Sequence, residues 1–354
     1  MLKGLLFCVA LPVFGQSGIE SIFAPLDAKA PGVAVLVLKS GKPIFERGYG
    51  VRDLRGMGKI GSGTNFRLAS FSKQFTAMAT MISVRDKRFT YESRLTDFFP
   101  DFPEWAKAIT VRHLLTHTSG LPDYEDLMGQ NWTAEKQISD QEVLDLLKKE
   151  KAPKFAAGTS WSYSNSGYVV LGLIIAQKGF EPFPDFLKRF IFDPLRMKNT
   201  VAYIKGTNNV GSRAFGHVLR DGKFLEADQS STSATLGDGG IYSNLDDLAK
   251  WDEALRQNKL LSKSEFAPAL IPIRLSNGTP PRYSYGFGWY LDPHRGRPRM
   301  WHSGETLGFR TVIQRFPEED LTIIVLANRT DLDVVKMSLQ AADLMDAREV
   351  APRK

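Results

Sequence analysis

Both ends of the chain carry short apolar runs separated by polar turns, a pattern typical of strands. Residues 33–38 are continuously apolar and predict a core strand, with residues 43–49 as its partner after a turn that contains glycine. Near the other end, residues 309–316 and 321–327 flank the polar turn 317–320 and predict a second hairpin. We therefore expect a sheet built from the two ends of the chain.

Between these ends the apolar residues recur mostly at helical spacing. Helices are predicted over residues 111–115, 141–149, 168–177, 183–192 and 244–255 and, after the last hairpin, 331–346. Residues 168–176 are rich in β-branched side chains, so their periodicity alone is also compatible with a strand. Terminal strands with helices between them imply a sheet with an inserted helical region, and a functional site at their junction.

One further helix has no charged side chain from residue 74 to residue 84. Its apolar stripe consists of Phe71, Phe75, Met78 and Ile82. Such a helix belongs in a core. Ser70 and Lys73 precede it at i and i+3, a spacing at which Cβ atoms on a helix lie about 5–6 Å apart. Burial would lower the pKa of the Lys73 amine, which could then act as a base toward the Ser70 hydroxyl, although most such pairs, taken alone, lie on a solvated helix surface.

Two other segments carry candidate chemistry. Tyr163 could relay a proton and Asn165 could orient a substrate carbonyl or the lysine, although a turn followed by a helix N-cap fits the same residues. Residues 300–303, which include His302, predict a short strand bounded by Gly304. The backbone there can lie beside a substrate and donate N–H groups, and an ordinary strand end is the alternative.

Taken together, Ser-x-x-Lys at 70–73, Tyr-x-Asn at 163–165 and His-x-Gly at 302–304 resemble the active-site signature of the serine β-lactamase and penicillin-binding protein superfamily. The resemblance is closest to the class C β-lactamase-like branch, which includes DD-peptidases, D-aminopeptidases and esterases. Other stretches similar to that branch are residues 66–77, 114–122, 194–200 and 238–243.

The resemblance covers about residues 22–345 and implies a single α+β catalytic domain. The expected fold is an antiparallel sheet with flanking helices, in an α/β part at about 22–80 and 235–345, and a helical subdomain at about 81–234. The resemblance also favours a helix over residues 168–176.

The same resemblance implies acyl transfer through an ester on Ser70. Lys73, together with Tyr163, would move the hydroxyl proton to the leaving group, and Asn165 would steady the lysine and the substrate amide. The sequence leaves open whether Lys73 or Tyr163 is the general base. No cofactor and no metal is required.

In the third segment, the resemblance assigns substrate binding to Ser303, Gly304 and Glu305. It also implies that the backbone N–H groups of Ser70 and Glu305 hold the oxyanion. His302, also carried over as a catalytic residue, stands where most of these β-lactamases have the lysine of Lys-Thr-Gly. Histidine is mostly neutral at pH 7, so a dedicated β-lactamase is disfavoured.

The leading prediction is thus a serine peptidase acting on a cell-wall D-alanyl peptide. The alternatives are a carboxylesterase or D-aminopeptidase, and then a β-lactamase. A protein that senses or binds envelope peptides is the non-enzymatic alternative, but the candidate nucleophile and lysine are both present. The natural substrate, whether a small molecule or a peptide, and the oligomeric state stay open.

Composition and the first residues of the chain predict the cellular compartment. The chain has 354 residues, 43% of them hydrophobic, and its only cysteine is Cys8, which leaves the folded part without a disulfide. Residues 1–15 resemble a cleavable signal peptide, too short to span a bilayer, so we expect a periplasmic or secreted protein without a stable membrane anchor. A buried N-terminal helix is the alternative.

Charge excludes further classes of partner. The net charge is +7, with a basic cluster at 294–299 that fits a solvated loop or a contact with anionic envelope polymers. No basic face is interleaved with aromatic residues, so no nucleic-acid partner is expected. His113 and His117 lie at i and i+4 without the glutamate of a zinc motif, and we interpret both as structural.

Overall fold

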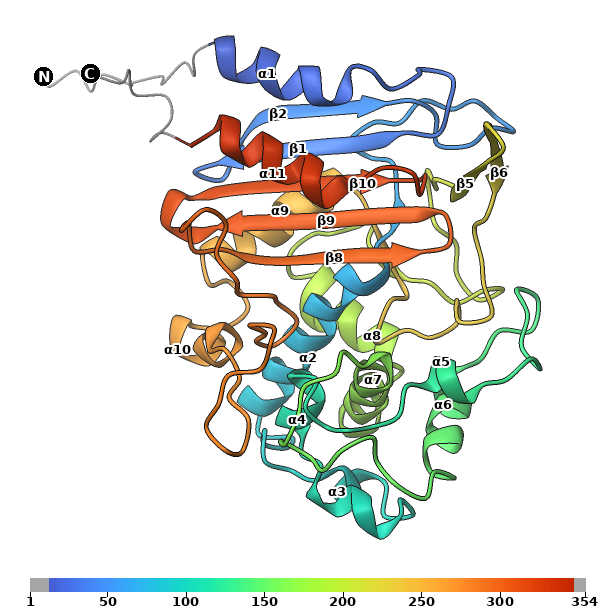
Figure 1. Ribbon diagram of the computed structural model, residues 1–354, viewed down its shortest axis with the longest axis vertical. Coiled ribbons are helices and arrows are strands. Elements are labelled where there is room, and N and C mark those ends of the chain that lie inside the picture. Colours follow the sequence, from blue (N-terminus) through green and yellow to red (C-terminus); the bar gives the residue numbers. More distant parts are fainter. Residues whose placement is uncertain (1–12, 347–354) are drawn as a thin grey trace, which may run out of the picture.

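The computed structural model describes residues 13–346, and its main feature is a five-stranded antiparallel sheet (Figure 1). The strand order is β2-β1-β10-β9-β8, which joins the N-terminal hairpin to the C-terminal strands. The strands are β1 (Val33–Lys39), β2 (Lys42–Tyr49), β8 (Met300–Thr306), β9 (Phe309–Phe316) and β10 (Leu321–Ala327). The pairing of β1 with β10 places Val33 opposite Ala327. The predicted sheet from the two ends of the chain is therefore confirmed.

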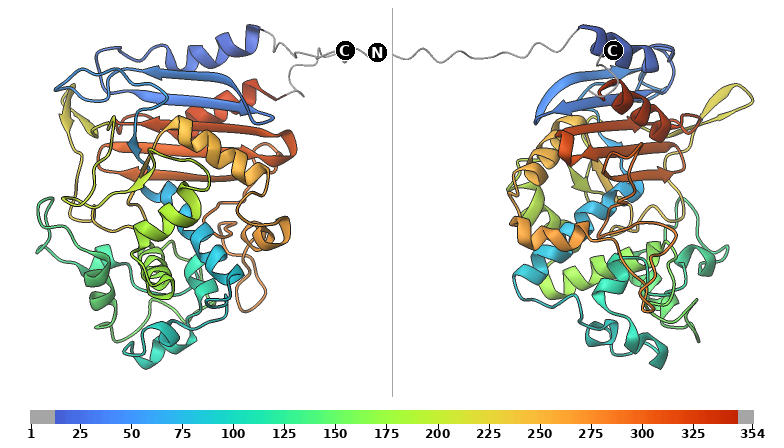
Figure 2. Two further views of the ribbon diagram at one scale, coloured as in Figure 1. Left: turned by 180° about the vertical axis from the view of Figure 1, so that it is seen from behind. Right: turned by 60° about the vertical axis from the view of Figure 1, so that its left-hand side comes forward.

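Both faces of this sheet are buried, which explains the continuous apolar run in β1. Alternate β1 residues, from Val33 to Val37, share a core cluster with α1 (Val13–Phe23) and α11 (Val334–Leu344). The residues between them belong to the larger core on the opposite face, as the two-residue period of a strand requires. The side view in Figure 2 shows α11 and α9 on opposite sides of the sheet.

The face opposite α1 and α11 packs against η1 (Ala69–Ser72), a 3₁₀ turn that leads into α2 (Lys73–Arg85), and against α9 (Leu245–Arg256). A buried ion pair attaches α9 to the sheet, because Arg315 Nε of β9 donates to Asp252 Oδ1 at 2.6 Å. These elements place the N-terminus of α2 directly against the sheet.

The chain between α2 and the small strand β7 is mainly helical. Its elements are α3 (Leu95–Phe98), η2 (Glu104–Ala108), α4 (Val111–Leu115), α5 (Tyr124–Leu127), α6 (Asp140–Leu147), α7 (Asn165–Gly179), α8 (Phe183–Leu187) and the π-turn η3 (Lys188–Phe192). The remaining short elements are β3 (Phe66–Arg67), β4 (Val201–Ala202), β5 (His217–Arg220), β6 (Lys223–Glu226), β7 (Ile241–Ser243), α10 (Lys263–Phe266), η4 (Ala267–Leu270) and η5 (Pro317–Glu319).

The structure decides two sequence-based expectations about elements. Residues 168–177 lie within the helix α7, so the helical alternative is confirmed. The strand predicted at residues 300–303 is present, but its expected end at Gly304 is wrong, because β8 runs on to Thr306 and pairs Glu305 with Arg310 of β9. The proposed division between residues 80 and 81 falls inside α2.

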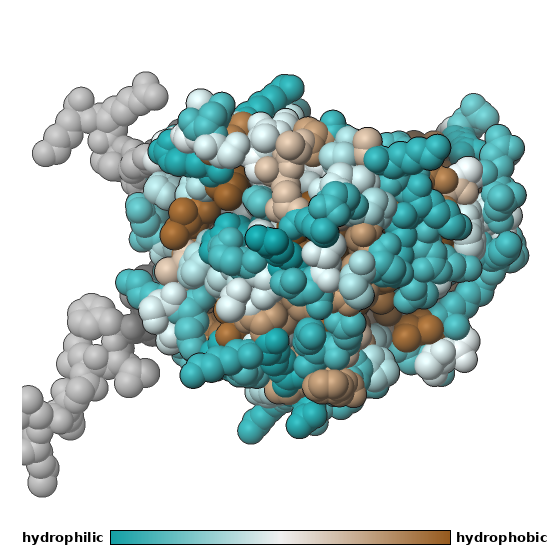
Figure 3. Space-filling view, turned by 90° about the horizontal axis from the view of Figure 1, so that it is seen from below, coloured by the Kyte–Doolittle hydropathy of each residue, from teal (hydrophilic) through white to brown (hydrophobic). Residues whose placement is uncertain are grey.

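The predicted signal segment lies mostly outside the described residues. Helix α1 begins at Val13 and includes the expected cleavage point after Gly15. Within residues 13–346, no helix is long and apolar enough to cross a membrane. Seen from below, the surface is mostly hydrophilic, with apolar residues in separate patches (Figure 3).

Candidate active site

The candidate nucleophile Ser70 lies in the 3₁₀ turn η1, directly before α2. Residues i and i+3 lie above one another in such a turn, and Lys73 Nζ is 3.0 Å from Ser70 Oγ. The preceding residue, Ala69, has a φ of +51°, a left-handed conformation that costs a non-glycine residue about 1–2 kcal/mol. Backbone strain of this kind clusters at active sites.

The amine of Lys73 is fully buried and has three partners. It lies 3.0 Å from Ser70 Oγ, 2.8 Å from Asn165 Oδ1 and 2.9 Å from the backbone oxygen of Asp238. The two carbonyl oxygens can only accept hydrogen bonds. In the neutral amine, both N–H bonds therefore point to Asn165 and Asp238, and the lone pair faces the Ser70 hydroxyl. Burial lowers the pKa of Lys73 to about 8, although three nearby carboxylates oppose that shift.

Asn165, the first residue of α7, is held on both sides of its amide. Its Oδ1 accepts from Lys73, and its Nδ2 donates to Glu125 Oε1 at 3.1 Å. Its backbone N–H donates to Asp123 Oδ2 at 3.3 Å. Burial raises the pKa of both Asp123 and Glu125. Together with Asp238, these are the carboxylates that oppose the lowering of the lysine pKa.

The carbonyl of Asp238 reaches the lysine because its loop packs tightly between α2 and α7. Thr76 Oγ1 donates to the Gly237 carbonyl at 2.6 Å. A Cβ atom on Gly237 would lie 2.2 Å from the backbone oxygen of Tyr168, so no larger residue fits there without a shift. The side chain of Asp238 accepts from the Tyr124 hydroxyl at 3.1 Å.

Tyr163 lies in the turn before α7, with its ring centroid 4.9 Å from Lys73 Nζ. Its hydroxyl is buried and forms no hydrogen bond with any residue that the structure describes. Burial raises the pKa of the phenol, and the neighbouring Ser70 hydroxyl partly opposes this shift. The phenol is therefore neutral near the candidate nucleophile Ser70 and can donate a proton.

His302 of β8 is also buried, but both of its ring nitrogens are engaged. Nδ1 lies 2.6 Å from the Ser303 carbonyl, which can only accept, so Nδ1 carries the proton. Nε2 accordingly accepts from the Tyr285 hydroxyl at 3.0 Å. Burial, reinforced by the charge of Lys73, lowers the pKa of His302 to about 3. The histidine is thus neutral and cannot replace the positive charge of a lysine.

The rest of the third segment places the edge strand β8 against η1, the turn that carries Ser70. A Cβ atom on Gly304 would lie 1.9 Å from the Leu68 carbonyl oxygen, so glycine allows β8 to approach the turn before Ser70. β8 is the last strand of its sheet, and an edge strand offers backbone groups to an extended ligand. Ser303 and Gly304 line a hollow beside the start of α11, whereas Glu305 lines both this hollow and the pocket at Ser70.

Most of the charged side chains that line the pocket at Ser70 are acidic. Glu125, Asp238 and Glu305 line it, and Arg67 is the one cationic residue among its lining residues. The Arg67 guanidinium donates to the Ser233 carbonyl at 3.0 Å. The pocket thus offers more negative than positive charge to a substrate.

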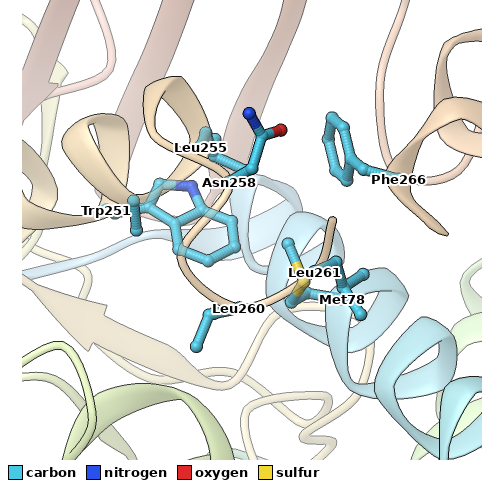
Figure 4. Close-up of a pocket in the computed structure, with 8 residues that line it drawn as sticks. Met78, Trp251, Leu255, Asn258, Leu260, Leu261 and Phe266 are labelled. Carbon is cyan, nitrogen blue, oxygen red and sulfur yellow. The ribbon is translucent and has the colours of Figure 1, made fainter. Parts of the chain in front are cut away.

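A second small pocket lies beside α2, and none of the candidate catalytic residues lines it. It is formed by α2, α9 and the chain that follows α9, with Met78, Trp251 and Phe266 in its wall (Figure 4). Asn258 and the indole nitrogen of Trp251 are the only polar side-chain groups in its lining. Among residues 13–346, no group of three or more His, Cys, Asp or Glu side chains is arranged to hold a metal ion.

Comparison with known proteins identifies the family. A family model described as Beta-lactamase matches residues 19–345, nearly the whole described chain. The chain belongs to the Beta-lactamase family. Penicillin-binding protein 4* of Bacillus subtilis is 32% identical over 341 residues, which cover 92% of this chain and 74% of that protein. A D-aminopeptidase of Cereibacter sphaeroides is 29% identical over 319 residues, and the match spans only 60% of its length.

Solved structures show the same fold. The D-amino acid amidase from Ochrobactrum anthropi matches with a TM-score of 0.80 at 24% identity, covering 95% of this chain and 99% of the other. The octameric penicillin-binding protein homologue from Pyrococcus abyssi matches with a TM-score of 0.79 at 23% identity, covering 95% and 77%. The predicted fold class and the prediction of a serine hydrolase of this family are confirmed.

Sequence reasoning missed several residues that build this site of the β-lactamase-family enzyme. Glu125 and the backbone of Asp238 hold Asn165 and Lys73, and His117 and Tyr285 pack around Tyr163 and His302. Asp238 and His117 lie in stretches that resemble the class C-like branch, which was a signal without an assigned role. The sequence carries no comparable signal for Glu125 or Tyr285.

Proposed function

We propose that this β-lactamase-family protein is an exported serine hydrolase that forms an acyl-enzyme on Ser70 and cleaves D-alanyl peptides of the cell wall. The observation that carries the proposal is the 3.0 Å contact between the buried Lys73 amine and the Ser70 hydroxyl. The similarity to Penicillin-binding protein 4* over most of its length supports the choice of a peptide substrate.

In the proposed reaction, neutral Lys73 takes the Ser70 proton as Oγ bonds to the substrate carbonyl carbon. The carbon–nitrogen bond then breaks, the leaving amine takes a proton from the Tyr163 hydroxyl, and the phenol regains one from the Lys73 ammonium. Water then attacks the ester carbonyl carbon and gives a proton to the same pair, the bond between that carbon and Oγ breaks, and Oγ takes the proton back from the pair as the acid product leaves. Backbone N–H groups of Ser70 and Glu305 are proposed to hold the oxyanion, where loss of one donor typically costs about 10²–10³ in rate.

Labelling with a fluorescent penicillin, followed by intact-mass analysis, tests the acyl-enzyme. We expect one adduct on the wild-type protein and none on Ser70→Ala. An adduct that persists in Ser70→Ala would contradict the assignment of the nucleophile. If the wild-type protein neither reacts with penicillin nor hydrolyses D-alanyl peptides or p-nitrophenyl esters, a peptide-binding protein becomes the better explanation.

An aminopeptidase that releases amino-terminal D-residues is the second candidate, and the acidic pocket favours it. Glu125 is exposed and lines the pocket at Ser70 together with Asp238 and Glu305, so a substrate ammonium group near the scissile carbonyl would be attracted. Neutral His302 provides no cation for a substrate carboxylate. The relatives that are D-aminopeptidases support this alternative.

D-alanine p-nitroanilide and its N-acetyl derivative separate the two candidates. The aminopeptidase alternative predicts at least about tenfold higher kcat/KM for the free amine, and loss of that preference in Glu125→Gln. The glutamine oxygen can still accept from Asn165, so the variant removes only the charge. Asp126→Asn is a matched control, because Asp126 pairs with Lys154 at 3.2 Å and does not line the pocket. A preference for the acetylated substrate would favour the D-alanyl peptidase.

Export is tested by cell fractionation and N-terminal sequencing. Cleavage after Gly15 would leave a mature chain beginning at Gln16, within the first turns of α1. Recovery of the protein in the cytoplasm with its N-terminal segment intact would contradict export.

A further inference from the structure

His117 connects the segment that carries Tyr163 to the strand that carries His302. It is 1% exposed, and its φ of +60° is a left-handed conformation that few non-glycine residues adopt. Its Nδ1 accepts the backbone N–H of Ser164 at 3.1 Å. Since the accepting nitrogen carries no proton, the ring is protonated at Nε2, which has no hydrogen-bond partner among residues 13–346.

The faces of the imidazole contact two tyrosines of the site. Ring centroids lie 4.3 Å from Tyr163 and 4.6 Å from Tyr285. The Tyr285 hydroxyl in turn donates a hydrogen bond to His302 of β8. One neutral imidazole therefore holds the backbone at Ser164 and packs against side chains on both sides of the site.

The Tyr163 hydroxyl forms no hydrogen bond with any described residue, so its position depends on packing and on the backbone of its turn. His117 contributes to both constraints, through the ring contact with Tyr163 and the hydrogen bond to the next residue, Ser164. Loss of the imidazole would leave the phenol free to move relative to the Ser70 hydroxyl and the Lys73 amine.

We propose that His117 is a positioning residue that holds the Tyr163 phenol in place for proton transfer to the leaving group. This inference rests on the acyl transfer proposed above. It assigns His117 a role in the rate of the reaction beyond the structural role expected from the sequence.

Two variants at His117 separate positioning from general stability. In His117→Asn the side-chain oxygen can still accept from the Ser164 N–H, whereas His117→Leu has similar bulk and no acceptor. His113→Leu is the matched control, because His113 Nδ1 likewise accepts a backbone N–H, that of Thr110, at the start of α4. Thermal denaturation of all three variants reports their stability.

Each variant is assayed with a D-alanyl amide, whose leaving amine needs a proton, and with a p-nitrophenyl ester, whose leaving group needs none. For His117→Leu we expect kcat on the amide to fall about 100-fold, with KM within about twofold and ester turnover reduced less than about tenfold. We expect His117→Asn to retain most of the amide activity, and His113→Leu to match the wild-type kcat even if its Tm falls.

Equal losses on amide and ester in His117→Leu, or no loss, would overturn the proposal, as would a loss in His117→Asn as large as in His117→Leu. Crystal structures give a readout that does not depend on turnover: the Tyr163 ring should move away from Ser70 in His117→Leu and stay in His117→Asn. An unmoved ring in His117→Leu overturns the proposal. Failure of the proposed function is a distinct result, in which the wild-type enzyme shows no Ser70-dependent hydrolysis.

Discussion

The pH dependence of Ser70 acylation tests whether Lys73 is the general base. Burial lowers the pKa of this lysine from 10.5 to about 8. At pH 7 about one-tenth of the amine would be neutral, compared with roughly one in three thousand for an unperturbed lysine. We expect the acylation rate to rise about tenfold per pH unit below pH 8 and to level off above it. The measurement is the burst of p-nitrophenol from an activated ester between pH 5.5 and 9.5.

Two variants control that measurement. Lys73→Arg keeps a permanent cation beside Ser70, and Lys73→Met removes the amine at similar length, so both should lose about 10²–10⁴ in acylation rate. A wild-type rate that is independent of pH, or that rises only with a midpoint above pH 10, would refute the assignment. A Lys73→Met variant that keeps the pH profile would assign the base to another group, such as Tyr163.

The same pKa shift predicts a link between stability and pH. Between pH 8 and 10.5 the unfolded chain holds the lysine proton that the folded protein releases, so the free energy of unfolding should rise with pH in this window. Below pH 8 the buried charge destabilises the fold by up to about 3 kcal/mol. Lys73→Met should therefore have a higher Tm than the wild type at pH 7, and a lower Tm would show that the charge is not destabilising.

Three further predictions concern packing and buried charge, each measured by thermal or urea denaturation. Gly304→Ala should lose about 1–3 kcal/mol and slow acylation, because its Cβ would overlap the turn before the nucleophile, whereas Gly211→Ala has open space and should be neutral. Burial raises the pKa of Asp140 to about 8, so the folded protein holds a proton that the unfolded chain releases above about pH 4. The free energy of unfolding should therefore fall as pH rises through this window. Asp140→Asn should raise Tm more at pH 8 than at pH 4, and an equal rise in Tm at both pH values would contradict this. Asp252→Ala leaves the Arg315 guanidinium buried without its counter-charge and should cost about 3–5 kcal/mol, and a loss below 1 kcal/mol would contradict this.

Local patterns were sufficient to predict the elements that carry the site. The apolar run of β1 is continuous because both faces of the sheet are covered, and the charge-free α2 is buried on every side. The i, i+3 spacing of Ser70 and Lys73 brought their side chains together because that spacing is set within a single turn. These features depend on residues close together in the chain.

Contacts between distant segments could not be predicted in this way. The Asp238 carbonyl reaches Lys73 only because Gly237 fits against α7, and no periodicity in the sequence encodes that fit. The extent of β8 was also missed, since Gly304 suggested an end where the structure uses glycine for a close approach to Leu68. The resemblance to a known family predicted that the three segments meet in one site. The residues between these segments did not predict it.

Charge in the site bears on the choice between the two candidate functions. The substrate of a D-alanyl peptidase carries a free carboxylate on the leaving side of the scissile bond, whereas the substrate of an aminopeptidase carries an ammonium group on the acyl side. The pocket at Ser70 offers the carboxylates of Glu125, Asp238 and Glu305 against the guanidinium of Arg67, and the third segment contributes a neutral imidazole. Two of these carboxylates, Glu125 and Asp238, limit together with Asp123 how far burial lowers the pKa of Lys73, so a bound ammonium group that screened them would move the lysine further toward its neutral form. An amine-bearing substrate would thereby promote the acylation of Ser70, and the acid limb of the pH profile should shift to lower pH with D-alanine p-nitroanilide but not with its N-acetyl derivative.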